Sequence, residues 1–203
     1  MAWAGQAQGI IYLSNFGQVS VGSEPVGNNS WLAADFRTGV NAGGFLLNSI
    51  QLAMTTDSGN PTGFTVMIYS SVSSGAVLPE SSLDTLSGSA NPSATGIYTY
   101  TSLSDIILLP STHYFIVLTA ATPTANGAYQ WSVTDTPTVT FNGWSANNLL
   151  CYSGNGSNWS FLSGTLAQYS ITATPVPEPS ISWLLVLGGS ICGFVRKRNH
   201  YSP

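Results

Sequence analysis

The sequence has very little charge. Lysine, arginine, aspartate and glutamate make up 6% of its 203 residues, whereas an ordinary soluble domain has roughly 25%. Residues 1–175 hold seven acids and a single base, Arg37, and one base minus seven acids gives a net charge of −6. Since lysine and arginine are the main ligands of phosphate groups, we expect no nucleic-acid partner. Hydrophobic residues still form 43% of the chain, enough to build a core, so wholesale disorder is not expected.

Cysteine is also scarce. Cys151 lies in the body of the chain and Cys192 lies in a C-terminal apolar run, so we expect no disulfide between them. No cysteine spacing typical of a zinc site occurs, and we expect Cys151 to be a small buried hydrophobic residue. We expect no cofactor and no metal. A structural calcium ion stays an open alternative, because DSGN at 57–60 partly resembles a calcium loop, without its repeated oxygen ligands and closing carboxylate.

The sequence offers no catalytic grouping, so we expect no enzyme and no catalytic residue. The two histidines are His113, at the start of a predicted strand, and His200, near the C-terminus. No serine has glycine both two residues before and two residues after it, as a nucleophile elbow requires. The acids of the body are scattered singly, and we expect most of them in turns. Two acids from distant loops could still pair in a glycan-active enzyme, which we keep as a minor alternative.

The C-terminal segment begins with a proline-rich break. The prolines at 175, 177 and 179 prevent a continuous helix or a central strand, which predicts an extended linker. Residues 181–195 then form an uncharged apolar run, and three cations follow it. The run is shorter than the roughly 20 residues that span a bilayer, but counting from Pro179 and letting the cations snorkel brings it close. We predict one transmembrane helix, with the cations in the cytoplasm and residues 1–175 on the other side. The alternative, a buried core helix, leaves the cations without a role.

This arrangement resembles the PEP-CTERM sorting signal of Gram-negative bacteria. The matching residues of the signal are Pro177, Glu178, Pro179, Arg196, Lys197 and Arg198. The resemblance implies processing by exosortase, a membrane protease-transpeptidase of species that make exopolysaccharide. It also implies a protein that is first anchored in the inner membrane with a periplasmic body, and that reaches the cell surface or the extracellular space after processing.

Export also requires an N-terminal signal peptide, and MAWAGQAQG lacks the basic and apolar regions of one. Its small residues at 2, 4, 5 and 7 are nevertheless spaced like those before a signal-peptidase cut. We interpret residues 1–9 as the remnant of a signal peptide or an N-terminal tail. A start codon assigned too late and a truncated chain are two explanations, and we expect the natural mature protein to begin near Ala7 or Gln8.

Between the ends, the hydrophobic pattern alternates with a period of two. The segments 45–54, 64–69, 113–119 and 128–133 each place apolar residues on one face, and turn sequences such as TANG and SGNG separate such runs. The residues that share a face are Ile50, Leu52 and Met54; Phe64, Val66 and Ile68; Tyr114, Ile116 and Leu118, with Phe115 and Val117 on the opposite face; and Tyr129, Trp131 and Val133. The pattern predicts an all-β, antiparallel, jelly-roll-like sandwich of about eight to ten strands over residues 10–173, followed by the sorting segment 174–203.

The body also resembles a bacterial family, the choice-of-anchor R domain. The similarity is carried by FRTGVNAGGFLLNSIQLAM at 36–54, by residues 63–88 and by residues 95–118. Arg37 and Phe115 stand where the family tends to have threonine and tryptophan. The family appears with various C-terminal anchors and has no assigned catalytic residue, so the resemblance implies a β-rich exported body and no site.

One segment, residues 141–161, suggests a ligand. It interleaves aromatic residues with asparagine, and such side chains stack on sugar rings and bond to hydroxyl groups. The candidate glycan-binding residues are Trp144, Asn147, Asn148, Tyr152 and Trp159. In the alternative interpretation the tryptophans anchor the core and the asparagines form turns.

We therefore expect an exported, non-catalytic cell-surface or matrix protein that associates with exopolysaccharide. The alternative is a carbohydrate-binding module that recognises the surrounding polymer through the segment 141–161.

Overall fold

The computed structural model describes residues 9–72, 76–88, 90–136, 138–147, 149–162 and 164–178. These residues form strands and turns without a helix, and every strand pairing is antiparallel. The prediction of an all-β antiparallel body is therefore confirmed. Within the described ranges no helix is long and apolar enough to cross a membrane, and the predicted tail helix lies outside them.

Sixteen strands make up the sheet. They are β1 (Ile10–Ser14), β2 (Gly22–Val26), β3 (Trp31–Arg37), β4 (Phe45–Gly59), β5 (Thr65–Ser71), β6 (Pro79–Gly88), β7 (Gly96–Thr101), β8 (Ile107–Leu108), β9 (His113–Thr119), β10 (Gly127–Thr134), β11 (Thr138–Phe141), β12 (Trp144–Asn147), β13 (Leu150–Ser153), β14 (Ser160–Leu162), β15 (Leu166–Ala167) and β16 (Tyr169–Pro175). The predicted eight to ten strands were too few, since segments interpreted as loops contain strands of two to four residues, such as β8 and β12 to β15.

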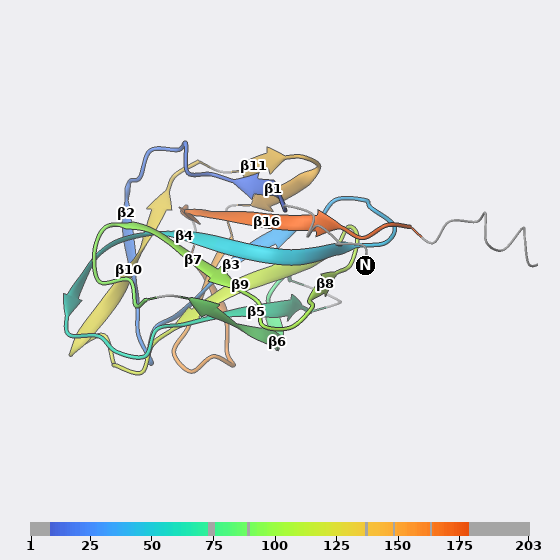
Figure 1. The fold of residues 1–203 in the computed structure, drawn as a ribbon. Helices are drawn as coiled ribbons and strands as arrows, with labels where there is room; N and C mark the ends of the chain where they lie inside the picture. The colour runs from blue at the N-terminus through green and yellow to red at the C-terminus, as the bar shows by residue number, and fades with distance from the viewer. Residues whose placement is uncertain are drawn as a thin grey trace, which may run out of the picture.

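The strands form a nearly closed, barrel-like sheet (Figure 1). Its order is β1-β16-β4-β7-β6-β5-β9-β3-β12-β11. The two halves are joined along one side because β6 pairs with both β5 and β7. On the other side the β11–β12 hairpin lies beside β1, where the side chain of Asn142 donates a hydrogen bond of 2.8 Å to the backbone carbonyl of Ile11. We call this contact between β1 and the β11–β12 hairpin the seam. It is closed by a side chain rather than by a ladder of backbone hydrogen bonds.

The interior of the barrel holds the main core, and the predicted faces are confirmed. The four sets of residues that the alternation placed on one face each belong to this core, with Phe64 partly buried at its edge. The two-residue period of a strand determines which residues share a face, because neighbouring residues point to opposite faces.

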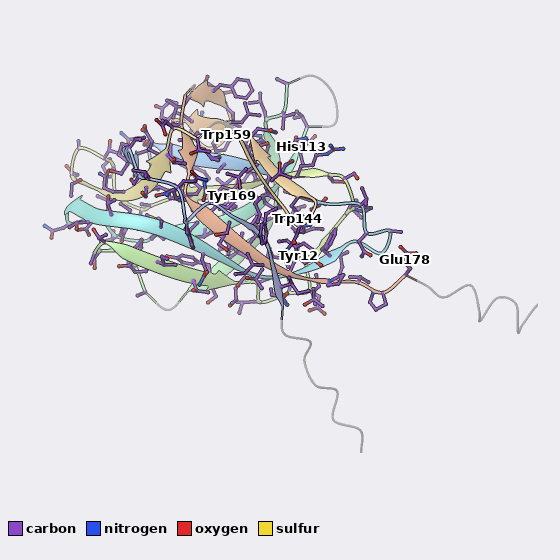
Figure 2. All side chains as sticks on the ribbon, turned by 90° about the horizontal axis from the view of Figure 1, so that it is seen from above. Tyr12, His113, Trp144, Trp159, Tyr169 and Glu178 are labelled. Carbon is purple, nitrogen blue, oxygen red and sulfur yellow. The ribbon has the colours of Figure 1, made fainter. Side chains whose placement is uncertain are left out.

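Trp144 occupies the core beneath the seam. It is fully buried, and its ring lies parallel to that of Phe36 at a centroid distance of 5.8 Å. It also stacks on Tyr12 at 5.2 Å and meets the edge of Phe45 at 5.0 Å; Figure 2 shows Tyr12 and Trp144 together. These three rings come from β1, β3 and β4, so one indole connects both ends of the sheet order.

A second apolar cluster lies on the outer face of the sheet. It consists of Ala33, Met67, Phe115, Val117 and Cys151, with Trp31, Tyr69, Val77, Leu78 and Trp159 packed around it, and we call it the outer cluster. Phe115 and Val117 alternate along β9 with residues of the main core, so this strand is buried on both faces. The prediction that Cys151 is a buried hydrophobic residue is confirmed.

The prediction for the acids was wrong. Five of the seven acids of the body lie in strands rather than in turns: Glu24, Asp35, Asp57, Glu80 and Asp84. The reason for Asp57 is that the end of the long strand β4 pairs with β10, and this pairing includes most of the proposed calcium loop. Asp105 and Asp135 lie between strands, as expected.

The body extends slightly beyond its predicted end at residue 173. Strand β16 continues to Pro175, and Val176 donates a backbone hydrogen bond of 3.0 Å to Gly44. The side chain of Asn41 donates a bond of 3.0 Å to the carbonyl of Val176. A proline is tolerated here because it stands at the last position of a strand.

Candidate functional site

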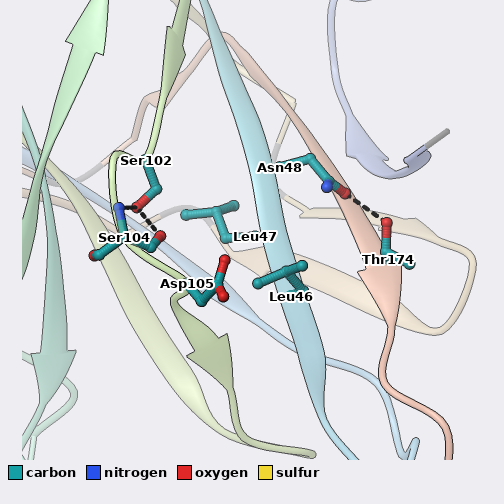
Figure 3. Close-up of a pocket in the computed structure, with 7 residues that line it drawn as sticks. All are labelled: Leu46, Leu47, Asn48, Ser102, Ser104, Asp105 and Thr174. Carbon is teal, nitrogen blue, oxygen red and sulfur yellow. Dashed lines mark hydrogen bonds between the residues drawn. The ribbon is translucent and has the colours of Figure 1, made fainter. Parts of the chain in front are cut away.

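A pocket of about 460 Å³ opens on the barrel where the last strand leaves it (Figure 3). Its seven lining residues are Leu46, Leu47, Asn48, Ser102, Ser104, Asp105 and Thr174. Strand β4 forms the floor, the loop between β7 and β8 forms one wall, and the end of β16 forms the other. The pocket thus brings together three segments that are far apart in the sequence.

A β-bulge places Asn48 in this pocket. Thr172 of β16 pairs with Ser49, but the next residue, Ala173, pairs with Leu47, so Asn48 is an extra residue without a partner in the ladder. Its Oδ1 atom accepts a hydrogen bond of 2.9 Å from the hydroxyl of Thr174. This bond fixes the orientation of the amide. Bulges are frequent where a strand has to redirect a side chain toward a site.

Asp84 holds the facing wall in place. One of its carboxylate oxygens accepts hydrogen bonds from the hydroxyls of Ser102 at 2.7 Å and Ser104 at 2.9 Å. These bonds, that of Ser102 first, lower the pKa of Asp84 below its usual value. The backbone N–H of Leu47 donates a bond of 3.0 Å to the carbonyl of Ile106, which ties the loop to the floor. The wall that carries Asp105 is therefore held at two points.

The chemistry of the pocket is polar with a single negative charge. Asp105 contributes the only carboxylate among its lining residues, and Asn48, Thr174 and the serines contribute amide and hydroxyl groups. The half-buried side chain of Leu46 adds an apolar surface. Such a lining suits a ligand with several hydroxyl groups, because amides and hydroxyls both donate and accept hydrogen bonds.

Sequence reasoning missed this pocket, although one signal was present. In the segment LLNSI, residues 46–50, two apolar residues are followed by two polar ones, whereas the residues after Ile50 alternate as far as Met54. That interruption is the mark of an extra residue, since a bulge shifts the two-residue period by one. The serines and Asp105 gave no signal, because their meeting with β4 depends on the folded topology.

The structure separates the predicted glycan-binding residues. Trp144 is fully buried in the main core, so its ring has no face to offer a sugar, and this part of the prediction is corrected. Asn147 is half-buried and its amide donates a bond of 3.4 Å to Asp35. Asn148 lies outside the described residues.

The remaining two members, Tyr152 and Trp159, lie on opposite faces of the β13–β14 hairpin. Tyr152 is 40% exposed and is paired with Leu32 of the main core. Trp159 is half-buried and packs on the outer cluster. The four described residues of the prediction thus form no common surface. The turn interpretation holds for Asn142, which has a φ of 48° in a tight hairpin turn with Gly143.

Asp35 and His113 form a buried polar pair on the outer face of β3 and β9. The Asp35 side chain is fully buried, and its Oδ2 atom lies 3.4 Å from Nδ1 of His113. Neither the other oxygen of Asp35 nor Nδ1 of His113 has a hydrogen-bond partner. Tyr169, a residue of the main core, donates a bond of 2.6 Å to the backbone carbonyl of Asp35 from the other side of the strand. His113 begins β9, as predicted.

Burial determines how these groups titrate. Loss of water raises the pKa of Asp35 from 3.8 to about 7, although hydrogen bonds from Asn147 oppose the shift. Burial, followed by the nearby charge of Arg37, lowers the pKa of His113. A protonated Asp35 that donates from Oδ2 to a neutral His113 gives the Nδ1 atom a partner. Burial also raises the pKa of the Cys151 thiol to about 12, so it stays protonated and is a poor nucleophile.

Within the described ranges, no three side chains of the histidine, cysteine, aspartate and glutamate type gather as a metal site would require. Of the sorting residues, Pro177 and Glu178 are described, and both are exposed; Pro179 and the three cations lie outside. Comparisons with protein-family models, with curated proteins and with solved structures find no match to this chain.

Proposed function

We propose that this is an exported, non-catalytic protein of the cell surface or extracellular matrix, sorted by exosortase through its C-terminal segment and associated with exopolysaccharide. The observation that carries the proposal is the order of three features: Pro177–Glu178–Pro179, the uncharged run 181–195 and the cations 196–198. A jelly-roll-type choice-of-anchor body and a single membrane-spanning helix belong to the same proposal.

The position of the motif supports it. Backbone hydrogen bonding of the last strand ends at Val176, and Pro177 and Glu178 are exposed beyond it. Figure 2 shows Glu178 at the periphery of the body, away from the labelled core residues. A protease needs an extended, accessible strip, and the strip here starts within two residues of the folded body.

The test replaces Arg196, Lys197 and Arg198 with glutamine in the natural host. The expected result is loss of processing, because the cations hold the predicted helix in its orientation. The matched control is Arg37→Gln, which removes a positive charge from the body and should leave processing intact. Intact mass and the location of the protein are the readouts. Unchanged mass and unchanged surface display of the triple variant contradict the sorting function.

Carbohydrate binding is a second candidate function, favoured by the aromatic side chains of the outer cluster. Trp31, Tyr69 and Trp159 are half-buried there, and Phe161 is 47% exposed opposite Cys151. Aromatic rings at a surface stack on sugar rings. If this surface binds the host exopolysaccharide, Trp159→Ala abolishes the change in tryptophan fluorescence on titration, whereas Tyr152→Ala, on the opposite face, retains it. Equal binding by both variants contradicts this placement.

A further inference from the structure

We infer that the pocket between β4, the β7–β8 loop and β16 binds a neutral hexose unit of a polysaccharide. This goes beyond the proposed function, because it concerns a different part of the molecule from the sorting segment and from the outer cluster. It holds whether or not the tail is processed.

The size of the pocket fits a sugar better than an ion. A volume of about 460 Å³ falls within the range of roughly 300–1,000 Å³ typical of small-molecule sites. Calcium ligands lie about 2.3–2.6 Å from the ion, and calcium favours several carboxylates. The pocket has a single carboxylate, that of Asp105, so its chemistry and its size both point away from a cation site.

The charge of the pocket restricts the ligand further. No lysine, arginine or histidine is among its lining residues, so a phosphate, a sulfate or a uronic acid would face Asp105 without compensation. A neutral sugar has no such penalty, and the carboxylate of Asp105 accepts hydrogen bonds from its hydroxyl groups. Hydrogen bonds that involve a charged partner are the stronger kind.

The lining groups are also arranged before any ligand arrives. The Thr174 bond orients Asn48, so that its Nδ2 group can donate to a sugar oxygen. Asp84 holds both serines of the opposite wall. Between them, the half-buried side chain of Leu46 provides an apolar surface for the C–H face of a sugar ring. Fixed polar groups around an apolar floor reduce the entropy that binding would otherwise lose.

The experiment uses the full chain in a detergent without a sugar headgroup. The probes are the methyl glycosides of glucose, galactose, mannose and N-acetylglucosamine, followed by saturation-transfer NMR and titration. At least one glycoside should bind saturably. Asp105→Asn should weaken its binding about 10-fold or more, because it removes a charged hydrogen-bond partner. The matched control is Asp135→Asn, at an exposed acid outside the pocket, which should leave the affinity unchanged.

A second variant keeps the test valid if Asp105→Asn fails to fold. Thr174→Val keeps the shape of the side chain but removes the hydroxyl that orients Asn48, and it should also weaken binding while the melting temperature stays close to that of the parent.

Three results overturn the inference. They are no saturable binding of any glycoside, equal affinities of Asp105→Asn and the parent, and binding of calcium chloride alone that depends on Asp105. None of the three bears on the sorting segment, whose test reads processing.

Discussion

Replacing Asp35 with asparagine should stabilise the protein at neutral and alkaline pH. The Asp35 carboxyl is fully buried, one of its oxygens has no hydrogen-bond partner, and the facing Nδ1 atom of His113 has none either. Ionised Asp35 is therefore a buried charge with little compensation. An asparagine at this position has the same shape, and its amide can donate to His113 as the protonated acid does.

The size of the effect follows from the pKa. Burial raises the pKa of Asp35 from 3.8 to about 7, so the folded state binds a proton that the unfolded state releases between these values. The stability contributed by this proton is fully present below pH 3.8 and is lost as the pH rises through about 7. A gap of about 3 pH units corresponds to about 4 kcal/mol of unfolding free energy.

The charged and polar groups around Asp35 come from the strands packed beside it. His113 of β9 and Arg37 of β3 carry or can carry positive charge, while Asn147 of β12 and Cys151 of β13 are neutral. The lowered pKa of His113 affects the unfolding free energy of the parent and of the variant nearly equally. The difference in unfolding free energy between the two proteins therefore reports on Asp35.

The assay is denaturant unfolding of parent, Asp35→Asn and the exposed control Asp135→Asn between pH 4 and pH 9. The difference between Asp35→Asn and the parent should grow from near zero at pH 4 to about 4 kcal/mol above pH 7. The control should stay within about 0.5 kcal/mol of the parent. Parallel pH profiles of parent and Asp35→Asn would refute the reasoning, since they would mean that Asp35 titrates equally in both states.

Two further predictions concern the core. Trp144→Ala should lower the unfolding free energy by about 3–5 kcal/mol, because it leaves a cavity beneath the seam. Thermal or denaturant melts measure this change. A loss below about 1 kcal/mol would mean that the indole does not hold the two ends of the sheet together. Tyr169→Phe should cost about 1–3 kcal/mol at constant pH, because it leaves the buried carbonyl of Asp35 without its 2.6 Å partner. The same melts check it, and an unchanged stability would mean that water replaces the hydroxyl.

The sequence predicted the strand faces well because side-chain direction follows a local rule. Ile116 and Phe115, for example, were assigned to opposite faces, and they pack in the main core and in the outer cluster. The sequence could not predict that the outer face of β9 would also be buried. That depends on Trp159 and on residues 77–78, which arrive from distant parts of the chain.

The candidate site was harder to predict than the fold. Asp105 and Asn48 are 57 positions apart, and only the pairing of β4 with β8 and β16 brings their segments together. The sequence did not single out Asp35, because a charge in a doubly buried strand is rare and composition gives no sign of it. Trp144 shows the converse case, in which an aromatic residue among asparagines belonged to the core.

The central claim is tested most directly by the intact mass of the mature protein recovered from the surface of its natural host. The account predicts a mass that lacks the apolar run and the cations beyond Glu178, and a triple glutamine variant at positions 196–198 that is not processed in this way. A mature surface protein that still carries Arg196, Lys197 and Arg198 would contradict it.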